Sequence, residues 1–329
     1  IIGTPDHWHC LQLVHACEAG KDVYVEKPMA NSLGELEVMV KAVRKYQRVV
    51  QVGQQQRSGR HWKMAIDFIK QGGIGQLRTI KIWANFRYGV GSPVVNDSPV
   101  PKGVDFDMWL GPAPERTFNQ NRFHGSWRMF WDYGGGLMTD WGVHLIDMAL
   151  WATDITTPPL SVVATGGNFS HKNFAHETFD TLSVNYQLKD FDIVWQSIGG
   201  IHTGPYNKLY GLAFVGNHGT LVADRGGWQV NPEVENEIAK SEAQSMESER
   251  TSSEDHIKNF LDCIKSRNEP SCPVENGRLV AQYSHMGNIA LRTESRLVWD
   301  QQKMNFGKNK AANRLIIPEY RKPWTFPKL

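Results

Sequence analysis

The sequence lacks the features that mark several broad classes of protein. Only four cysteines occur among 329 residues, and none forms a C-x-x-C pair, so neither a zinc ribbon nor a disulfide scaffold is indicated. No apolar run approaches the roughly 18 residues that a membrane-spanning helix needs. Lysine plus arginine number 36 and aspartate plus glutamate 34, so the chain lacks the basic excess of a general nucleic-acid binder.

Length and composition favour a globular protein of two domains. A chain of 329 residues is long for one small domain, and 40% hydrophobic with 21% charged residues is typical of a chain that buries a core. Twelve tryptophans contribute to an aromatic share of 11%. Such a composition accompanies pockets for sugar rings, but these side chains also fill cores.

The first residues are unusual for the start of a protein. Ile1-Ile2 resembles the last piece of a buried strand, and no initiator methionine or signal peptide is visible. We therefore expect a strand cut in its middle and a chain whose first part lies upstream of Ile1. The localisation cannot be inferred from this end.

Residues 1–57 alternate strands and helices. Short strands are expected at Ile1-Ile2, Val23–Val25 and Val49–Val52, with helices at about 7–19 and 32–46 between them. The second helix begins with an S-x-x-E capping box. This order predicts parallel βαβ units, in which ligands bind at the carboxyl ends of the strands.

Residues 58–329 are expected to form an α+β domain with a large, open, mostly antiparallel sheet. Helices are predicted at roughly 60–71, 254–266 and 275–294. Residues 87–130 have little periodicity, which is typical of a functional loop. The acidic stretch 232–255 is expected to be an exposed excursion, and the C-terminal tail to pack back on the first domain. The strand-like runs are Leu77–Phe86, Leu160–Gly166, Asp180–Leu188, Phe191–Ile198 and Leu209–Val215.

A glycine-led helix carries the strongest chemical signal. Three glycines, 134–136, let backbone approach a ligand closely, and a single helix is predicted to follow. Asp140, His144 and Asp147 stand at i, i+4 and i+7, so they are expected to share one face of that helix. A carboxylate one turn from an imidazole can orient it for general acid–base work. The alternative is that His144 is a core histidine and Asp140 a surface residue.

A second signal is Glu26-Lys27-Pro28, at the end of a predicted strand. Lys27 can act there as a fixed cation for a hydroxyl, or it can be a salt-bridged surface lysine. Pro28 restricts Lys27 to extended geometry and can carry a cis bond.

A third signal is Thr4-Pro5-Asp6-His7-Trp8-His9, which also fits an ordinary helix start. His7 and His9 are two residues apart and do not face each other on a helix, so no metal site is expected.

Together these motifs resemble the Gfo/Idh/MocA family, which includes glucose–fructose oxidoreductase and inositol dehydrogenase. The order is T-P-D-H-W-H, then V-Y-V-E-K-P, then G-G-G-x-x-x-D-x-G-x-H-x-x-D, and the resemblance extends to the Y-R-x-P-W ending. It implies a partial Rossmann domain at 1–57 followed by an α+β domain at 58–329. The family's G-x-G-x-x-G turn and ribose-binding acid do not occur here, and both are expected upstream of Ile1.

The resemblance also implies roles for individual residues. Lys27, Asp140 and His144 would be catalytic, with His144 the general base and Asp140 holding substrate. Arg57, Trp131 and Asp140 would contact the sugar. The cofactor, NAD or NADP, would be bound by Thr4, Pro5, His9, Glu26, Lys27 and Gln54.

The implied function is an NAD(P)-dependent oxidoreductase acting on a sugar, polyol or sugar derivative. The alternatives are an NAD-dependent glycoside hydrolase that oxidises, eliminates, adds water and reduces, and a non-catalytic member or inactive fragment. The partners expected are a small carbohydrate and further copies of the chain, as a dimer or tetramer, with no nucleic acid and no membrane. Relatives occur in the bacterial cytoplasm and in the periplasm after twin-arginine export, and both remain open.

Overall fold

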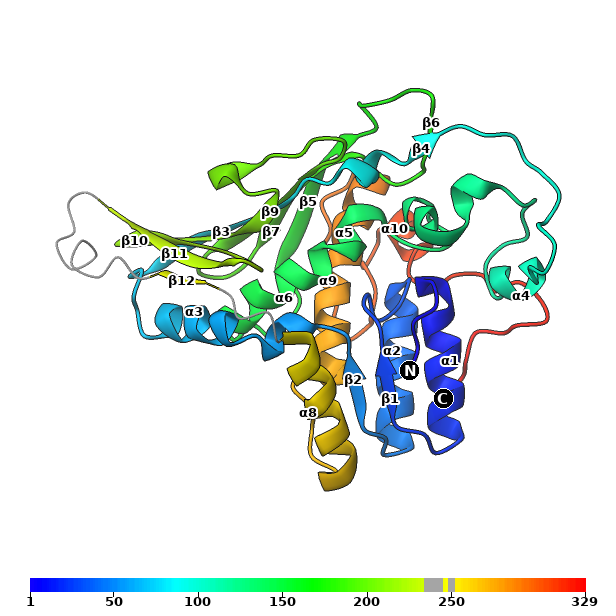
Figure 1. Cartoon of the computed structure of the whole chain (residues 1–329), viewed down its shortest axis with the longest axis horizontal. Coiled ribbons are helices and arrows are strands. Elements are labelled where there is room, and N and C mark those ends of the chain that lie inside the picture. The colour runs from blue at the N-terminus through cyan, green and yellow to red at the C-terminus, as the bar shows by residue number, and fades with distance from the viewer. Residues whose placement is uncertain (234–244, 248–251) are drawn as a thin grey trace.

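The computed structural model describes residues 1–233, 245–247 and 252–329. In Figure 1 a small α/β unit built from the first part of the chain lies beside a large sheet with helices beneath it. The α/β fold and the mostly antiparallel second sheet expected from the sequence are both confirmed.

The N-terminal unit contains two short parallel strands and two helices. Strands β1 (Val23–Val25) and β2 (Val50–Val52) pair in parallel, and Ile2 bridges Val25 in the same sense. Helices α1 (Asp6–Glu18) and α2 (Leu33–Lys45) connect them. Ser32 caps α2 by accepting a hydrogen bond from the Glu35 amide, as the capping box predicts.

In the described residues the second part is organised around an eight-stranded sheet in the order β12-β11-β10-β9-β3-β8-β7-β5, where β3 and β8 are the one parallel pair. Strands β10 and β11 were not expected from the sequence. The bounds are β3 Leu77–Ala84, β5 Ser161–Gly167, β7 Thr181–Gln187, β8 Asp192–Ile198, β9 Tyr210–Gly216, β10 Gly219–Asp224, β11 Gly227–Pro232 and β12 Ser245–Glu247. A two-stranded sheet, β4 (Ser92–Pro93) with β6 (Phe174–Ala175), stands apart.

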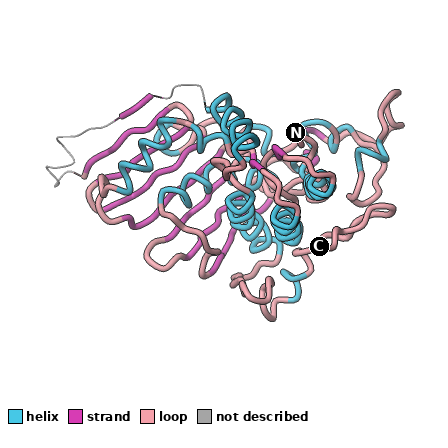
Figure 2. The backbone as a smooth tube through the Cα atoms, turned by 90° about the horizontal axis from the view of Figure 1, so that it is seen from below, coloured by secondary structure: helices cyan, strands magenta, loops and turns pink. Residues whose placement is uncertain are grey.

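Helices cover one face of the large sheet. Figure 2 shows several helices lying along the strands on that side. Leu182, Val184 and Tyr186 of β7 face the helices and are buried, while the alternate Ser183 and Asn185 are half-buried, as their period of two predicts. The remaining helices are α3 Arg60–Lys70, α4 Phe106–Leu110, α5 Gly136–Asp140, α6 Gly142–Ala152, α8 Ser252–Ser266, α9 Val274–Arg292 and α10 Lys310–Asn313.

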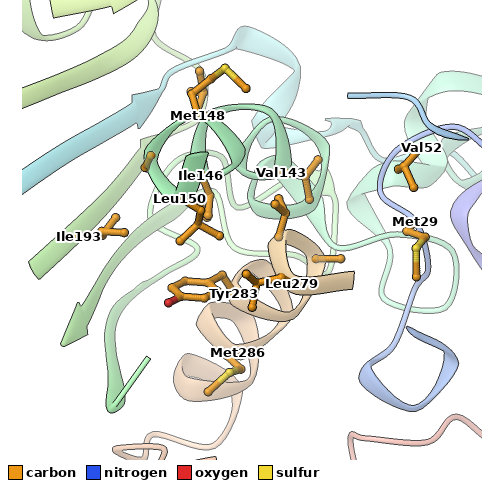
Figure 3. Packing of buried hydrophobic residues seen from close by; sticks show 14 of the residues in the cluster. Met29, Val52, Val143, Ile146, Met148, Leu150, Ile193, Leu279, Tyr283 and Met286 are labelled. Carbon is orange, nitrogen blue, oxygen red and sulfur yellow. The ribbon is translucent and has the colours of Figure 1, made fainter. Parts of the chain in front are cut away.

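Helix α9 forms the centre of the core. Figure 3 shows Leu279 and Tyr283 of α9 beside Ile146 and Leu150 of α6. Gly277 lets α9 lie close to β2, because a Cβ at that position would stand 2.6 Å from a Val52 methyl group. One hydrophobic core therefore spans both parts of the chain.

The described C-terminal tail lies against the N-terminal unit. The Tyr320 hydroxyl donates a hydrogen bond to the buried Glu35 carboxylate (2.5 Å), and the Trp324 ring meets the Trp8 ring edge-on. The acidic stretch expected at 232–255 lies mostly outside the described residues. No helix in the described residues is both long and apolar enough to span a membrane.

A buried ion pair ties the junction of the two parts. The Arg57 guanidinium follows β2 and bonds the Asp147 carboxylate of α6, with Nη2 2.6 Å from Oδ1. The Asp147 side chain is fully buried. Asp154, two residues after the end of α6, pairs with Lys70 and is largely exposed.

We expect Asp147→Asn to lower the free energy of unfolding by about 3 kcal/mol or more, because it leaves the Arg57 charge uncompensated inside the protein. The control Asp154→Asn should change it by less than about 1 kcal/mol, since exposed pairs contribute little. Urea unfolding followed by tryptophan fluorescence measures both. Equal effects of the two substitutions would contradict a stabilising role for the buried pair.

Candidate active site

The carboxyl ends of the parallel strands meet at one edge of the N-terminal unit. Ile2 pairs with Val25, and Val25 with Val52, so the segments that follow these residues emerge side by side. Glu26 and Gly53 are close enough that a Cβ on Gly53 would lie 2.9 Å from the Glu26 carboxylate. Sheets of this kind bind ligands at this edge.

Lys27 extends from this edge to the second part of the molecule. Its Nζ lies 2.5 Å from Oδ1 of Asp140 and 2.8 Å from the Asp140 carbonyl oxygen. The side chains of Lys27 and Asp140 are only 15% and 11% exposed. The Lys27–Pro28 peptide is cis, one of the geometries raised from the sequence. Lys27 is therefore salt-bridged, as one alternative held, but it is not a surface residue.

Two further donors complete the surroundings of Asp140. The Tyr88 hydroxyl donates to Oδ2 at 2.7 Å, and Nε of Arg128 lies 3.3 Å from Oδ1. Burial raises the pKa of Asp140, but the charges of Lys27 and Arg128 outweigh it and hold the pKa below its usual range. Asp140 is therefore ionised at neutral pH.

The prediction of a single helix after the three glycines is wrong. Helix α5 ends at Asp140 and α6 begins at Gly142, with Trp141 between them. The Trp141 ring lies between the Phe86 ring, 4.4 Å away, and the Arg225 guanidinium, 4.5 Å away. This packing, together with the weak helix propensity of Gly142, accounts for the break.

The break changes the partners expected for these residues. The Asp140 carboxylate bonds Lys27, Tyr88 and Arg128, and the Asp147 carboxylate bonds Arg57, so among the described residues neither carboxylate is hydrogen-bonded to the His144 ring. Within the described residues, the buried Nδ1 of His144 has no hydrogen-bond partner. Burial, followed by the charges of Lys27 and Arg225, holds the pKa of His144 well below its ordinary value. Its imidazole is therefore neutral at neutral pH.

The residues expected on the cofactor side gather at the strand ends. The His9 ring joins two segments, with Nδ1 2.8 Å from the Pro28 carbonyl oxygen and Nε2 2.9 Å from that of Thr4. Pro5 precedes the first residue of α1. Gln54 is buried at the end of β2, and its Oε1 has no partner among the described residues.

Arg57 and Trp131 are not brought to this cluster. Arg57 is buried against Asp147, as described above. Trp131 carries the Arg292 guanidinium over its ring at 4.6 Å and lines another cavity, of about 240 Å³, between the start of α2 and the C-terminal tail.

A cleft of about 400 Å³ opens beside Asp140. Arg128 and Tyr88 line it and were not expected from the sequence, although both lie within the irregular segment 87–130 that was expected to be functional. No spacing relates them to Asp140, so no motif signals them. The lining residues are Tyr88, Gly91, Ser92, Gly125, Ser126, Arg128, Met129 and Asp140. In the described part of the chain, no group of three or more His, Cys, Asp or Glu is placed to hold a metal ion.

Comparison with known families identifies both parts of the chain. Residues 1–54 match the model of the oxidoreductase family NAD-binding Rossmann fold, and residues 74–195 and 224–326 match that of the oxidoreductase family C-terminal alpha/beta domain. The chain belongs to the Gfo/Idh/MocA family of oxidoreductases.

Curated relatives of this family member match in part. An uncharacterized oxidoreductase of Rhizobium meliloti is 29% identical over 36% of this chain, and the uncharacterized oxidoreductase YrbE of Bacillus subtilis is 27% identical over 53%. The aligned segments span only 38% and 40% of those proteins. A glycosyl hydrolase family 109 protein of Shewanella baltica is 31% identical over 77 residues, 23% of this chain and 17% of its own.

Solved structures share the fold of most of this chain. Levoglucosan dehydrogenase in complex with NADH and levoglucosan superposes with a TM-score of 0.67 at 18% identity, covering 90% of this chain and 78% of that one. The aldose–aldose oxidoreductase of Caulobacter crescentus, complexed with glycerol, gives 0.65 at 19% identity, covering 90% and 77%. The WlbA dehydrogenase of Bordetella pertussis, with NADH and UDP-GlcNAcA, gives 0.63 at 18%, covering 91% and 78%.

The Lys27–Asp140 pair predicts a distinct pH dependence of stability. In the wild type the lowered pKa of Asp140 gives stability that is present at neutral pH and lost as the pH falls through that pKa. In Lys27→Met, burial should instead raise the pKa of Asp140, so the folded variant gains a proton and stability as the pH falls.

We therefore expect Lys27→Met to be less stable than the wild type at pH 7.5, by an amount that shrinks toward pH 5. Urea unfolding at several pH values measures this difference. Lys41→Met, at an exposed position of α2, is the matched control and should show no such trend. A deficit that stays constant or grows on acidification would contradict the assignment.

Proposed function

We propose that this protein is an NAD(P)-dependent oxidoreductase that transfers a hydride between a nicotinamide cofactor and a sugar, polyol or sugar derivative. One observation carries the proposal. Lys27, at the strand-end edge of the matched NAD-binding unit, bonds Asp140, which lines the cleft of the second domain. The strand ends that would bind the cofactor and the cleft that would bind the substrate therefore meet at Lys27 and Asp140.

The residues at the strand ends suit the nicotinamide side of a dinucleotide. Three parallel strand ends converge there, and the buried Oε1 of Gln54 lacks a partner among the described residues, as a ligand contact would leave it. Thr4, Pro5, His9, Glu26, Lys27 and Gln54 would hold the cofactor. Bound there, NAD(P) supplies the hydride acceptor.

The chain's own residues would orient the substrate and move the proton. The Lys27 ammonium, fixed by two bonds to Asp140, donates a hydrogen bond to the reacting hydroxyl. Asp140, ionised and held by Tyr88 and Arg128, accepts a hydrogen bond from a neighbouring hydroxyl. His144, whose buried Nδ1 has no partner among the described residues, takes the hydroxyl proton as general base.

The same groups would also serve an NAD-dependent glycoside hydrolase. The similarity to the glycosyl hydrolase family 109 protein of Shewanella baltica favours this second candidate, over 23% of the chain. A dehydrogenase releases NADH in proportion to the sugar consumed, whereas this hydrolase would release an aglycone without net NADH.

We expect Lys27→Ala and His144→Ala each to reduce turnover about 10²–10⁴-fold, the usual contribution of acid–base groups. The measurement is NADH absorbance with a panel of sugars and polyols, in parallel with aglycone release from nitrophenyl glycosides. Lys41→Ala serves as the control on an exposed helix position. Turnover near the wild-type level in folded Lys27→Ala or His144→Ala would show that the residue is structural.

We also propose that the protein forms a homo-oligomer through the face of the large sheet opposite its helices. Val194 of β8 and Asn185 of β7 are direct neighbours on adjacent strands of this face. Both side chains are half-buried, so no helix covers them completely. Flat sheet faces of this kind commonly form symmetric interfaces.

Light scattering at micromolar concentration should therefore give a mass that is a multiple of 37.3 kDa. Val194→Lys should shift it toward the monomer, because a buried unpaired charge opposes association. Lys63→Glu, exposed on α3 at the other side of the sheet, should leave the mass unchanged. A monomer mass for the wild type would contradict the proposal.

A further inference from the structure

The groups around Asp140 carry an excess of positive charge. One carboxylate is shared by two cations, because Oδ1 of Asp140 lies 2.5 Å from Nζ of Lys27 and 3.3 Å from Nε of Arg128. In the described residues, neither cation makes an ion pair with a second acid. Asp140 balances one charge, so this trio has a net charge of +1.

The neighbouring charged groups do not cancel the excess. Arg225 lies over the Trp141 ring, and its Nε donates to Oε1 of Gln56 at 3.0 Å rather than to an acid. Asp6 is buried at the start of α1, and its burial raises its pKa well above the usual range, which favours the neutral acid over a counter-charge. The Glu26 carboxylate is directed to Gly53 at the strand ends.

Arg128 has the geometry of a carboxylate ligand. Its guanidinium lies over the Trp127 ring, 4.4 Å from the centroid, which fixes the guanidinium plane. Nε contacts Asp140, Nη1 donates to the Gly125 carbonyl oxygen at 3.4 Å, and no hydrogen bond of Nη2 is seen among the described residues. The side chain is 35% exposed where it lines the cleft, and a planar guanidinium with N–H groups left to donate binds carboxylates.

The rest of the cleft suits hydroxyl groups. The hydroxyl-bearing residues Ser92, Ser126 and Tyr88 line it together with Asp140. Its volume, about 400 Å³, is near the small end of ligand pockets, which run from about 300 to 1,000 Å³. These dimensions suit one sugar ring rather than a polymer.

We propose that the cleft binds a sugar acid, a monosaccharide whose carboxylate pairs with Arg128 while its hydroxyls lie against Asp140 and Lys27. This assignment names the substrate class of the proposed oxidoreductase and rests on that function. Within it, Arg128 determines specificity for the anionic substrate.

The test is calorimetric titration of the wild type, Arg128→Gln and the control Arg78→Gln, which is exposed on β3 outside the cleft. The probes are D-glucuronate, D-glucose and D-glucose 6-phosphate. Glucuronate should bind about tenfold or more tightly than glucose, as expected for a charge-assisted bond. Arg128→Gln should remove this preference, Arg128→Lys should restore part of it, and Arg78→Gln should keep it.

Equal binding of glucose and glucuronate, or a preference that survives Arg128→Gln, would overturn the inference. Tighter binding of the 6-phosphate would overturn the choice of a carboxylate. Circular dichroism checks that the variants are folded. Arg128-dependent glucuronate binding without NAD reduction by any sugar would refute the proposed oxidoreductase while supporting the sugar-acid site. Glucose oxidation that Arg128→Gln leaves unchanged would support the proposed oxidoreductase and refute the sugar-acid site.

Discussion

The ion pair between Lys27 and Asp140 joins the two parts of the molecule, and Asp140 lines the cleft beside it. Lys27 is held at the end of a parallel strand, and Asp140 is the last residue of α5, so their bond at 2.5 Å requires the two parts to keep a fixed relation. The shared core around α9 maintains that relation. Because the pair is almost fully buried, either partner left alone would be an uncompensated charge.

Aromatic packing positions the acidic partner. Trp141 interrupts the helix directly after Asp140. Its ring is held between Phe86, which follows β3, and Arg225 of the β10–β11 turn. The carboxylate therefore faces Lys27, Tyr88 and Arg128, while His144 lies in the first turn of the next helix with an unpartnered Nδ1 in the described structure. The break thus separates a charged acceptor from a neutral one within five residues of sequence.

The sequence was informative where the chemistry is local. The strand ends, the capped helix at Ser32 and the choice of Lys27 and Asp140 as candidate residues all follow from short motifs and their resemblance to the family. The helix break was missed because the spacing of Asp140, His144 and Asp147 fits one continuous helix, and the tertiary packing of Trp141 beside Gly142 disrupts it. Arg128 and Tyr88 reach Asp140 from an irregular loop, where no periodicity constrains position. Arg57 was expected at the sugar, but its partner Asp147 lies in the core.

A double-mutant cycle for Lys27→Met and Asp140→Asn tests the central claim most directly. The free energies of unfolding of the wild type, both single variants and the double variant give the coupling energy of the pair. The structure predicts a coupling of about 1.5 kcal/mol or more at pH 7.5, as measured for close, desolvated charge pairs. Additive effects within about 0.3–0.5 kcal/mol would contradict the claim that this ion pair joins the two parts of the protein.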